Sequence, residues 1–203
     1  MTLGTGVGGG IVADGAIYRG AHGFAAEIGH FTVDPRGPRC ACGEPGHWEA
    51  YASGTALGRM GAEWASAGDA PALLARAGGD PAAVTGVDVG DLAREGDADA
   101  LALVGEYADR VALGLAALAN ILDPERIVVG GGLVELGDLL FAPLRVAFEH
   151  HVEGRSYRPA VPIVPAELGE RAGAVGAAAL ARTLVGDGGG DGGGDGGGGG
   201  AGP

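Results

Sequence analysis

Lysine is absent from this chain of 203 residues, and all 13 of its basic residues are arginine. That absence excludes a Walker-type lysine on a phosphate, a Schiff-base lysine and a lysine general base. Cysteine is also scarce, since only Cys40 and Cys42 occur. Because a disulfide between such near neighbours would be badly strained, the pair indicates a metal site or free thiols.

Long apolar runs and positive charge are also lacking. No apolar run reaches the length that spans a bilayer and no basic-then-apolar start resembles a signal peptide, so we expect a cytoplasmic protein without membrane contact. The formal net charge of -13 at pH 7 argues against a nucleic-acid partner, because nucleic-acid phosphates need a basic face. A nucleotide can still bind an acidic protein through backbone N–H groups and a metal ion.

The order of predicted elements indicates an α/β domain. Strands are predicted at residues 2–12, 16–19, 31–33, 127–129 and 161–164. Helices are predicted at residues 49–67, 71–77, 97–122, 136–150 and 172–184. The predicted strands come first along the chain, and alternating helices and strands follow them. This order favours a mixed sheet with helices packed against it. Residues 186–203 are mostly glycine with spaced aspartates, and we expect a disordered tail there, after a domain over residues 1–185.

The clearest helix, residues 97–122, has apolar positions that alternate steps of four and three, which predicts one buried stripe. The stripe consists of Val104, Ala108, Val111, Leu115, Leu118 and Leu122. Asp97 is expected to cap the start of this helix, and Asp123-Pro124 to end it.

Two glycine clusters are candidate ligand sites. Residues 3–12 read LGTGVGGGIV, in which glycines let backbone N–H groups approach an anion and Thr5 adds a hydroxyl donor. The strand–loop–strand context differs from a dinucleotide fingerprint, and a tightly turning hairpin is the other interpretation. Gly130–Gly132 lies between a predicted strand and helix, where open α/β sheets bind ligands, although a tight turn would use the same residues.

A cluster of metal-ligating residue types lies between the glycine clusters. His30, Cys40, Cys42 and His47 offer two imidazoles and two thiols within one turn-rich segment. Zinc favours four such ligands in tetrahedral geometry, whereas the alternative is two chance cysteines near two ordinary histidines.

Polar residues flank this cluster on both sides. Glu27, His30 and Glu49 combine carboxylates with an imidazole, a set that suits the hydroxyl groups of a sugar. The alternative is a helix-start carboxylate at Glu49 and a surface charge at Glu27.

Taken in order, these motifs resemble the ROK family of bacterial sugar kinases and repressors, and its glucokinases in particular. The resemblance is carried by LGTGVGGGIV from Leu3, by Glu27-Ile28-Gly29-His30, by the spacing from His30 through Cys40 and Cys42 to Glu49, and by Val128-Val129-Gly130-Gly131-Gly132. It covers residues 1–184 and implies the carboxy-terminal domain of an actin-like, ribonuclease-H-like fold.

The resemblance also implies an activity, ATP-dependent phosphorylation of glucose or a related hexose with Mg²⁺, and a homo-oligomer. It assigns phosphate contacts to Gly4, Thr5, Gly6, Gly8 and Gly9, and adenosine contacts to Gly131 and Gly132. It assigns sugar hydroxyls to Glu27, His30 and Glu49. It assigns Zn²⁺ to His30, Cys40, Cys42 and His47, where His47 replaces a cysteine of the family.

One part of the family pattern is expected to be missing. The resemblance places the general-base aspartate, which takes the proton from the sugar hydroxyl, in an amino-terminal domain that we do not find here. Since phosphoryl transfer needs both walls of the cleft, we expect no sugar phosphorylation by this polypeptide alone. The other interpretations are a fragment of a sugar-responsive regulator, which would need a helix-turn-helix domain, and a non-catalytic zinc- and sugar-binding module.

Overall fold

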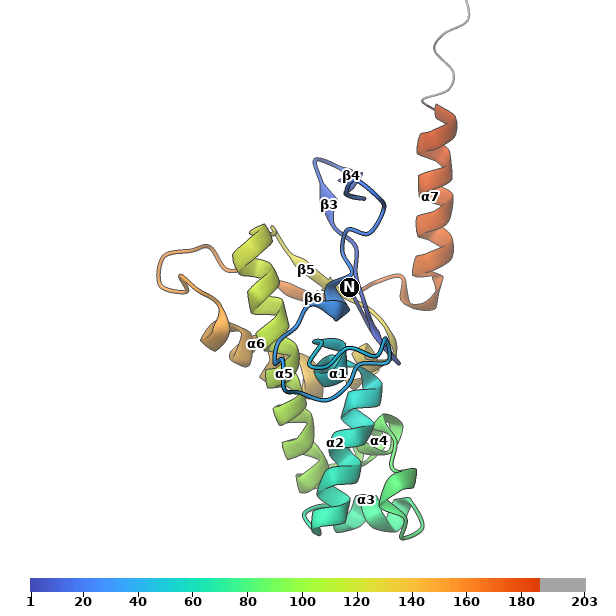
Figure 1. The fold of residues 1–203 in the computed structure, drawn as a ribbon, viewed down its shortest axis with the longest axis vertical. Helices are drawn as coiled ribbons and strands as arrows, with labels where there is room; N and C mark the ends of the chain where they lie inside the picture. The colour runs from blue at the N-terminus through green and yellow to red at the C-terminus, as the bar shows by residue number, and fades with distance from the viewer. Residues whose placement is uncertain (187–203) are drawn as a thin grey trace, which may run out of the picture. The chain divides into compact units, whose positions relative to one another are not determined.

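The computed structural model describes residues 1–186 of the chain (Figure 1). They divide into one unit of residues Met1–Ala166 and a second unit that begins at Glu167. The second unit contains the 3₁₀ helix η4 (Gly169–Arg171) and helix α7 (Ala172–Gly186), which confirms the predicted last helix. The predicted tail lies, from Asp187 onward, outside the described residues, and the expected domain boundary at residue 185 stays a prediction.

Four short strands of the first unit run side by side and form the expected mixed arrangement. Strands β1 (Thr2–Leu3) and β2 (Val7–Gly8) pair antiparallel, and β5 (Ile127–Val129) and β6 (Ile163–Pro165) pair parallel. A parallel bridge between Thr2 and Gly130 connects the two pairs. The amino terminus is fixed in the same place, because the Met1 ammonium donates to the Val128 carbonyl over 2.7 Å.

The predicted long first strand is wrong, because it is divided into β1, β2 and β3 (Val12–Ala13). Glycines interrupt it, since they favour turns over an extended ladder. Strand β3 pairs with β4 (Ala16–Ile17) through the predicted turn, in which Asp14 and Gly15 both have positive φ (51° and 75°). The strand predicted at residues 31–33 is also wrong, because only Thr32 pairs there, in a single bridge to His47.

The first unit contains six α-helices. They are α1 (Glu49–Ala52), α2 (Gly54–Ala67), α3 (Pro71–Arg76), α4 (Gly86–Glu95), α5 (Ala98–Leu122) and α6 (Asp138–His151). Of these, α2, α3 and α4 extend away from the strands on one side (Figure 1). The unit also has three 3₁₀ helices: η1 (Ile28–His30) precedes α1, η2 (Pro81–Ala83) lies between α3 and α4, and η3 (Gly132–Leu136) lies between β5 and α6. No helix within the described residues combines the length and the apolar character that crossing a membrane requires.

Two helix predictions need correction. The single helix predicted at residues 49–67 is broken at Ser53, whose backbone is extended and whose hydroxyl caps α2 by accepting a hydrogen bond from the Ala56 N–H. Helix α4 was not predicted, although its sequence contains a start signal: Thr85 and Asp88 form a capping box at its amino terminus.

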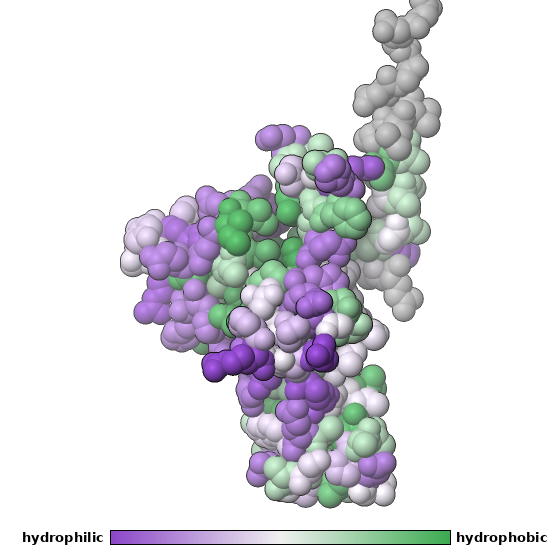
Figure 2. All heavy atoms as spheres, in the orientation of Figure 1, coloured by the Kyte–Doolittle hydropathy of each residue, from purple (hydrophilic) through white to green (hydrophobic). Residues whose placement is uncertain are grey.

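Helix α5 is the centre of the hydrophobic core. Asp97 caps it as predicted, by accepting a hydrogen bond from the Ala100 N–H over 2.9 Å. The predicted stripe is buried from Val104 to Leu115, half-buried at Leu118 and exposed at Leu122. Helix α6 packs along α5. Figure 2 shows apolar side chains gathered on the surface where α5 ends and β5 begins, a region that includes the exposed Ile121 and Val128.

A close contact joins α5 to the segment that carries the predicted metal ligands. Trp48 is wholly buried, and its indole N–H donates to the Arg110 carbonyl over 3.0 Å. The ring lies where a side chain at Gly114 would otherwise be, because an added Cβ at Gly114 would overlap it. The buried Tyr107 hydroxyl donates to the Ala52 carbonyl over 2.6 Å and holds the end of α1 to the same helix.

We expect Gly114→Ala to lower the free energy of unfolding by about 1–3 kcal/mol, because the methyl group must displace the buried indole. Urea unfolding measures the loss. Gly105→Ala is the control in the same helix, since its added Cβ meets no atom within 4 Å, and it should raise stability by about 0.5–1 kcal/mol. If Gly114→Ala were as stable as the parent, the close packing of Trp48 against Gly114 would be contradicted.

Candidate functional site

The first glycine cluster forms a short loop, Gly4–Gly6, between β1 and β2. The Gly4 N–H donates to the Gly6 carbonyl over 3.0 Å. At the start of α2, the Gly54 N–H donates to the Gly4 carbonyl (2.7 Å) and the Thr55 hydroxyl donates to the Thr5 carbonyl (2.8 Å). The loop is therefore fixed against the amino terminus of a helix.

A cavity of about 850 Å³ opens beside this loop. Gly4 and Thr5 line it together with Gly132, so the structure brings residues of both glycine clusters to one cavity. The rest of the wall comes from α2, α4, η2 and η3 and includes Gly54, Thr55, Arg59, Thr85, Gly86 and Arg94. The volume lies within the range typical of small-molecule sites.

Two helix amino termini contribute to the cavity wall, although the chain as a whole is acidic. The amino termini of α2 and α4 both reach its wall, and a helix amino terminus carries partial positive charge. Arg59 and Arg94 also line this wall, where Arg59 pairs with Glu63 and Arg94 pairs with Asp91. The partial positive charge of these two amino termini suits a phosphate without any lysine.

The remaining predicted nucleotide residues lie outside the cavity lining. Gly131 has φ 94°, and an added Cβ would overlap the Leu3 backbone, so glycine is needed for the close approach of β1. Gly8 and Gly9 have neighbouring side chains at the position of an added Cβ. Gly132 differs from them, because an added Cβ there meets no atom within 4 Å.

The four predicted metal ligands lie together. The ligand atoms of His30, Cys40, Cys42 and His47 are all within 4.8 Å of one another. His30 Nδ1 is 3.7 Å from Cys40 Sγ, and His47 Nδ1 is 3.2 Å from Cys42 Sγ. A tetrahedral zinc ion with two nitrogen and two sulfur ligands requires ligand separations of about 3.3–3.8 Å. The donor set therefore fits such an ion, and the ligand atoms, which lie within 4.8 Å of one another, would need to move only slightly closer to bind it.

The two thiols of this cluster differ in environment. Cys40 is buried, whereas Cys42 is exposed. Burial raises the pKa of the Cys40 thiol to about 11, and Glu49 shifts it in the same direction. The metal-free thiol is therefore protonated at neutral pH and donates to Glu49 Oε1 over 3.2 Å. A metal ion would have to replace this proton.

The predicted sugar residues surround the metal cluster. His30 presents Nδ1 to Cys40, and its Nε2 lies 4.0 Å from Glu27 Oε2. Glu49 reaches the cluster from the other side and also accepts a hydrogen bond from the Val7 N–H over 2.9 Å. Sequence reasoning missed Trp48, whose buried side chain positions the segment that carries the metal ligands. The available signal was the position of this large apolar residue directly before Glu49 in the sequence.

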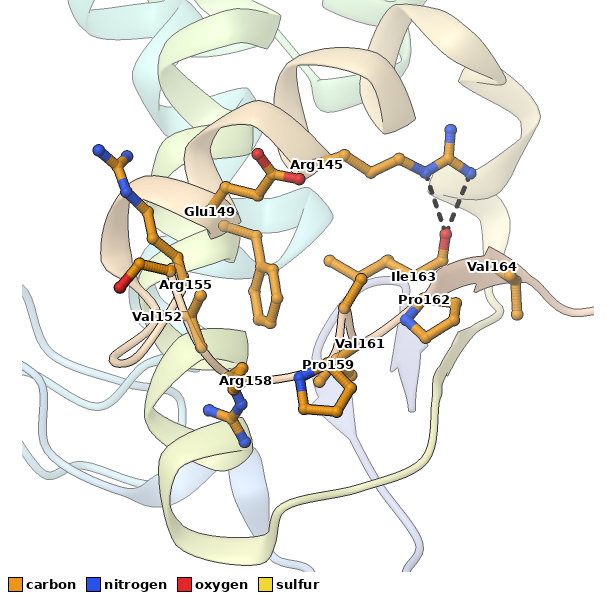
Figure 3. A pocket seen from close by; sticks show the side chains of 13 residues that line it. Arg145, Glu149, Val152, Arg155, Arg158, Pro159, Val161, Pro162, Ile163 and Val164 are labelled. Carbon is orange, nitrogen blue, oxygen red and sulfur yellow. Dashed lines mark hydrogen bonds between the residues drawn. The ribbon is translucent and has the colours of Figure 1, made fainter.

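A second cavity, of about 580 Å³, lies between α6 and residues 155–164 (Figure 3). Two of its three arginines are engaged in holding the fold. Arg145 donates from Nε and Nη2 to the Ile163 carbonyl over 3.1 and 3.0 Å, as the dashed lines in Figure 3 show. Arg158 donates to the Ala119 carbonyl over 3.1 Å and pairs with Asp123. The predicted glycine residues Gly4 and Gly132 line the first cavity and not this one, which makes the first cavity the better candidate for the nucleotide.

Comparison with known proteins identifies the family, because the sequence model of the ROK family matches residues 1–184 of this chain. The chain belongs to the ROK family. A glucokinase from Streptomyces coelicolor is 43% identical over 184 residues, which cover 90% of this chain and 58% of that protein. A xylose repressor from Bacillus spizizenii is 29% identical over 178 residues, 86% of this chain and 41% of the repressor. The chain thus spans little more than half of the curated glucokinase.

The solved structures agree with this membership. The ROK family glucokinase from Streptomyces griseus, in complex with glucose and AMPPNP, superposes with a TM-score of 0.82 at 42% identity. The match covers 90% of this chain and 59% of the neighbour. Both the resemblance and the expected α/β, actin-like fold class are thereby confirmed.

The two adjacent glycines of the ROK strand-to-helix turn should respond differently to alanine. Gly131→Ala is expected to cost about 1–3 kcal/mol of unfolding free energy, because a side chain at positive φ would also overlap β1. Gly132→Ala, with open space and no positive φ, should stay within about 0.5 kcal/mol of the parent. Thermal and urea unfolding measure both, and a similar loss in the two variants would contradict the difference.

Proposed function

We propose that this chain forms the nucleotide-, sugar- and zinc-binding part of an ATP-dependent hexose kinase of the glucokinase type. The observation that carries the proposal is the placement of the glycine loop. At one end Gly4 and Thr5 line the first cavity, and directly after the other end Val7 is bonded to Glu49 beside the metal cluster. Phosphoryl transfer needs a donor phosphate and an accepting hydroxyl close together, which a loop this short supports.

The proposed ATP site extends over the glycine loop and the first cavity. In it, backbone N–H groups receive the phosphates and Mg²⁺ neutralises their charge. The phosphate residues are Gly4, Thr5, Gly6, Gly8 and Gly9, and the adenosine side is bounded by Gly131 and Gly132. The AMPPNP named for the Streptomyces griseus glucokinase supports an adenine nucleotide.

The proposed sugar site consists of Glu27, His30 and Glu49, with glucose or a related hexose as the acceptor. Zn²⁺ bound by His30, Cys40, Cys42 and His47 would fix the imidazole tautomer of His30. The free Nε2–H of His30 would then donate to a sugar hydroxyl. The whole kinase is proposed to be a homo-oligomer, and the exposed apolar residues at the end of α5 are candidates for its interface.

A sugar-responsive regulator is the second candidate, since the xylose repressor is also a relative. The open space at Gly4 and Gly132 favours the kinase. Neither residue has a positive φ and an added Cβ at either meets nothing within 4 Å, so neither conformation nor packing requires glycine there. A ligand against the backbone would require it.

The nucleotide site is tested by isothermal titration calorimetry with Mg²⁺ and AMPPNP. We expect the parent chain to bind, and Gly4→Ala and Gly132→Ala each to weaken binding tenfold or more, because the methyl group occupies ligand space.

Gly10→Ala is the matched control for this titration. Gly10 is exposed, its added Cβ meets nothing within 4 Å, and it lies outside the cavity lining. Its affinity should equal that of the parent. Unchanged affinity in both Gly4→Ala and Gly132→Ala would overturn the nucleotide assignment, and binding of glucose without any nucleotide binding would favour the regulator.

The metal site is tested by elemental analysis of the purified chain. About one zinc ion per chain is expected, lost in Cys40→Ser and strongly reduced in His47→Ala, because each removes one of four ligands. His47→Cys should retain zinc, and His22→Ala, which removes an exposed histidine outside the cluster, should leave zinc content unchanged. A parent chain without stoichiometric zinc would refute the site.

A further inference from the structure

Both carboxylate oxygens of Glu49 are engaged in the structure. Oε2 accepts a hydrogen bond from the Val7 N–H over 2.9 Å, and Oε1 accepts one from the Cys40 thiol over 3.2 Å. Val7 begins β2, directly after the glycine loop. Glu49 therefore connects the metal cluster to the loop that reaches the first cavity.

Gly6 shows how closely the carboxylate approaches the loop. An added Cβ at Gly6 would overlap Glu49 Oε2, so the carboxylate fills the space that a side chain at this position would take. Gly6 itself lies outside the cavity lining. The requirement for glycine at position 6 therefore comes from Glu49 and not from a ligand in the cavity.

The loop needs a fixed point at this end. Its first part is held by the start of α2, through Gly54 and Thr55. After the loop, β2 has only two residues, which limits the ladder that can hold it. The Val7 side chain is buried in the core, and the charge-assisted bond from the Val7 N–H to Glu49 fixes the backbone as well, since such bonds are shorter and stronger than neutral ones.

We propose that Glu49 is a positioning residue for the nucleotide, in addition to its proposed sugar contact. Its carboxylate fixes the Gly6–Val7 peptide and thereby sets the orientation of Gly4 and Thr5 in the cavity wall. Glu49 lies outside the cavity lining, so its effect on the nucleotide passes through the loop. The inference rests on the proposed function, because it requires a nucleotide at this loop.

A role in sugar binding alone leads to a different expectation. If Glu49 contacted only the sugar, nucleotide affinity measured without sugar would not depend on it. If Glu49 positions the loop, glutamine should restore nucleotide affinity, because its amide oxygen can accept from the Val7 N–H and its amide nitrogen can donate to sulfur.

The experiment measures the dissociation constant for AMPPNP with Mg²⁺ by calorimetry, with sugar left out. Glu49→Ala is expected to weaken binding tenfold or more, and Glu49→Gln to remain within about threefold of the parent. Gly6→Ala keeps the carboxylate but displaces it, so it should resemble Glu49→Ala. Gly10→Ala is the control and should bind like the parent. Hydrogen exchange at the Val7 amide should accelerate in Glu49→Ala and Gly6→Ala only.

The outcomes separate this inference from the function on which it rests. A parent chain that binds no nucleotide overturns both. A parent that binds, with unchanged affinity in Glu49→Ala, overturns the positioning role alone. If Glu49→Ala does not fold, as judged by circular dichroism, then Gly6→Ala decides, and parent-like affinity with parent-like Val7 exchange in that variant overturns the inference.

Discussion

The packing of Trp48 against Gly114 is the contact on which the site depends. The indole is wholly buried and bonded to a carbonyl of α5, while its neighbours in sequence, His47 and Glu49, are polar residues of the site. A turn-rich segment has little apolar surface of its own, so its position must come from elsewhere. The most deeply buried helix of the fold supplies that position, and the missing side chain at residue 114 allows the approach.

Glycine has two physical roles in this site. At Gly114, Gly6 and Gly131 an added Cβ would overlap atoms of the protein, so glycine there serves packing. At Gly4 and Gly132 the same Cβ would meet open space in the cavity wall. The first group keeps helices, strands and the carboxylate of Glu49 in place, and the second leaves backbone accessible to a ligand. Only coordinates distinguish the two groups.

The electrostatics of the site explain how an acidic chain without lysine suits an anion. Two helix amino termini reach the wall of the first cavity, so local fixed dipoles act against a net charge of -13. Beyond the loop, two imidazoles and two thiols gather in a cluster suited to a cation. Glu49 joins these two regions of opposite electrostatic preference.

The sequence by itself determined the family, the fold class, the turn at Asp14-Gly15 and the capped helix after Asp97. These depend on short motifs and on backbone preferences within a few residues. The tertiary structure alone decided which glycines line the cavity, that Trp48 holds the site, and that Glu49 bonds β2. Trp48 and its acceptor are 62 residues apart, and Val7 and Glu49 are 42 apart. No local pattern encodes such contacts, because they form only when the whole core has packed.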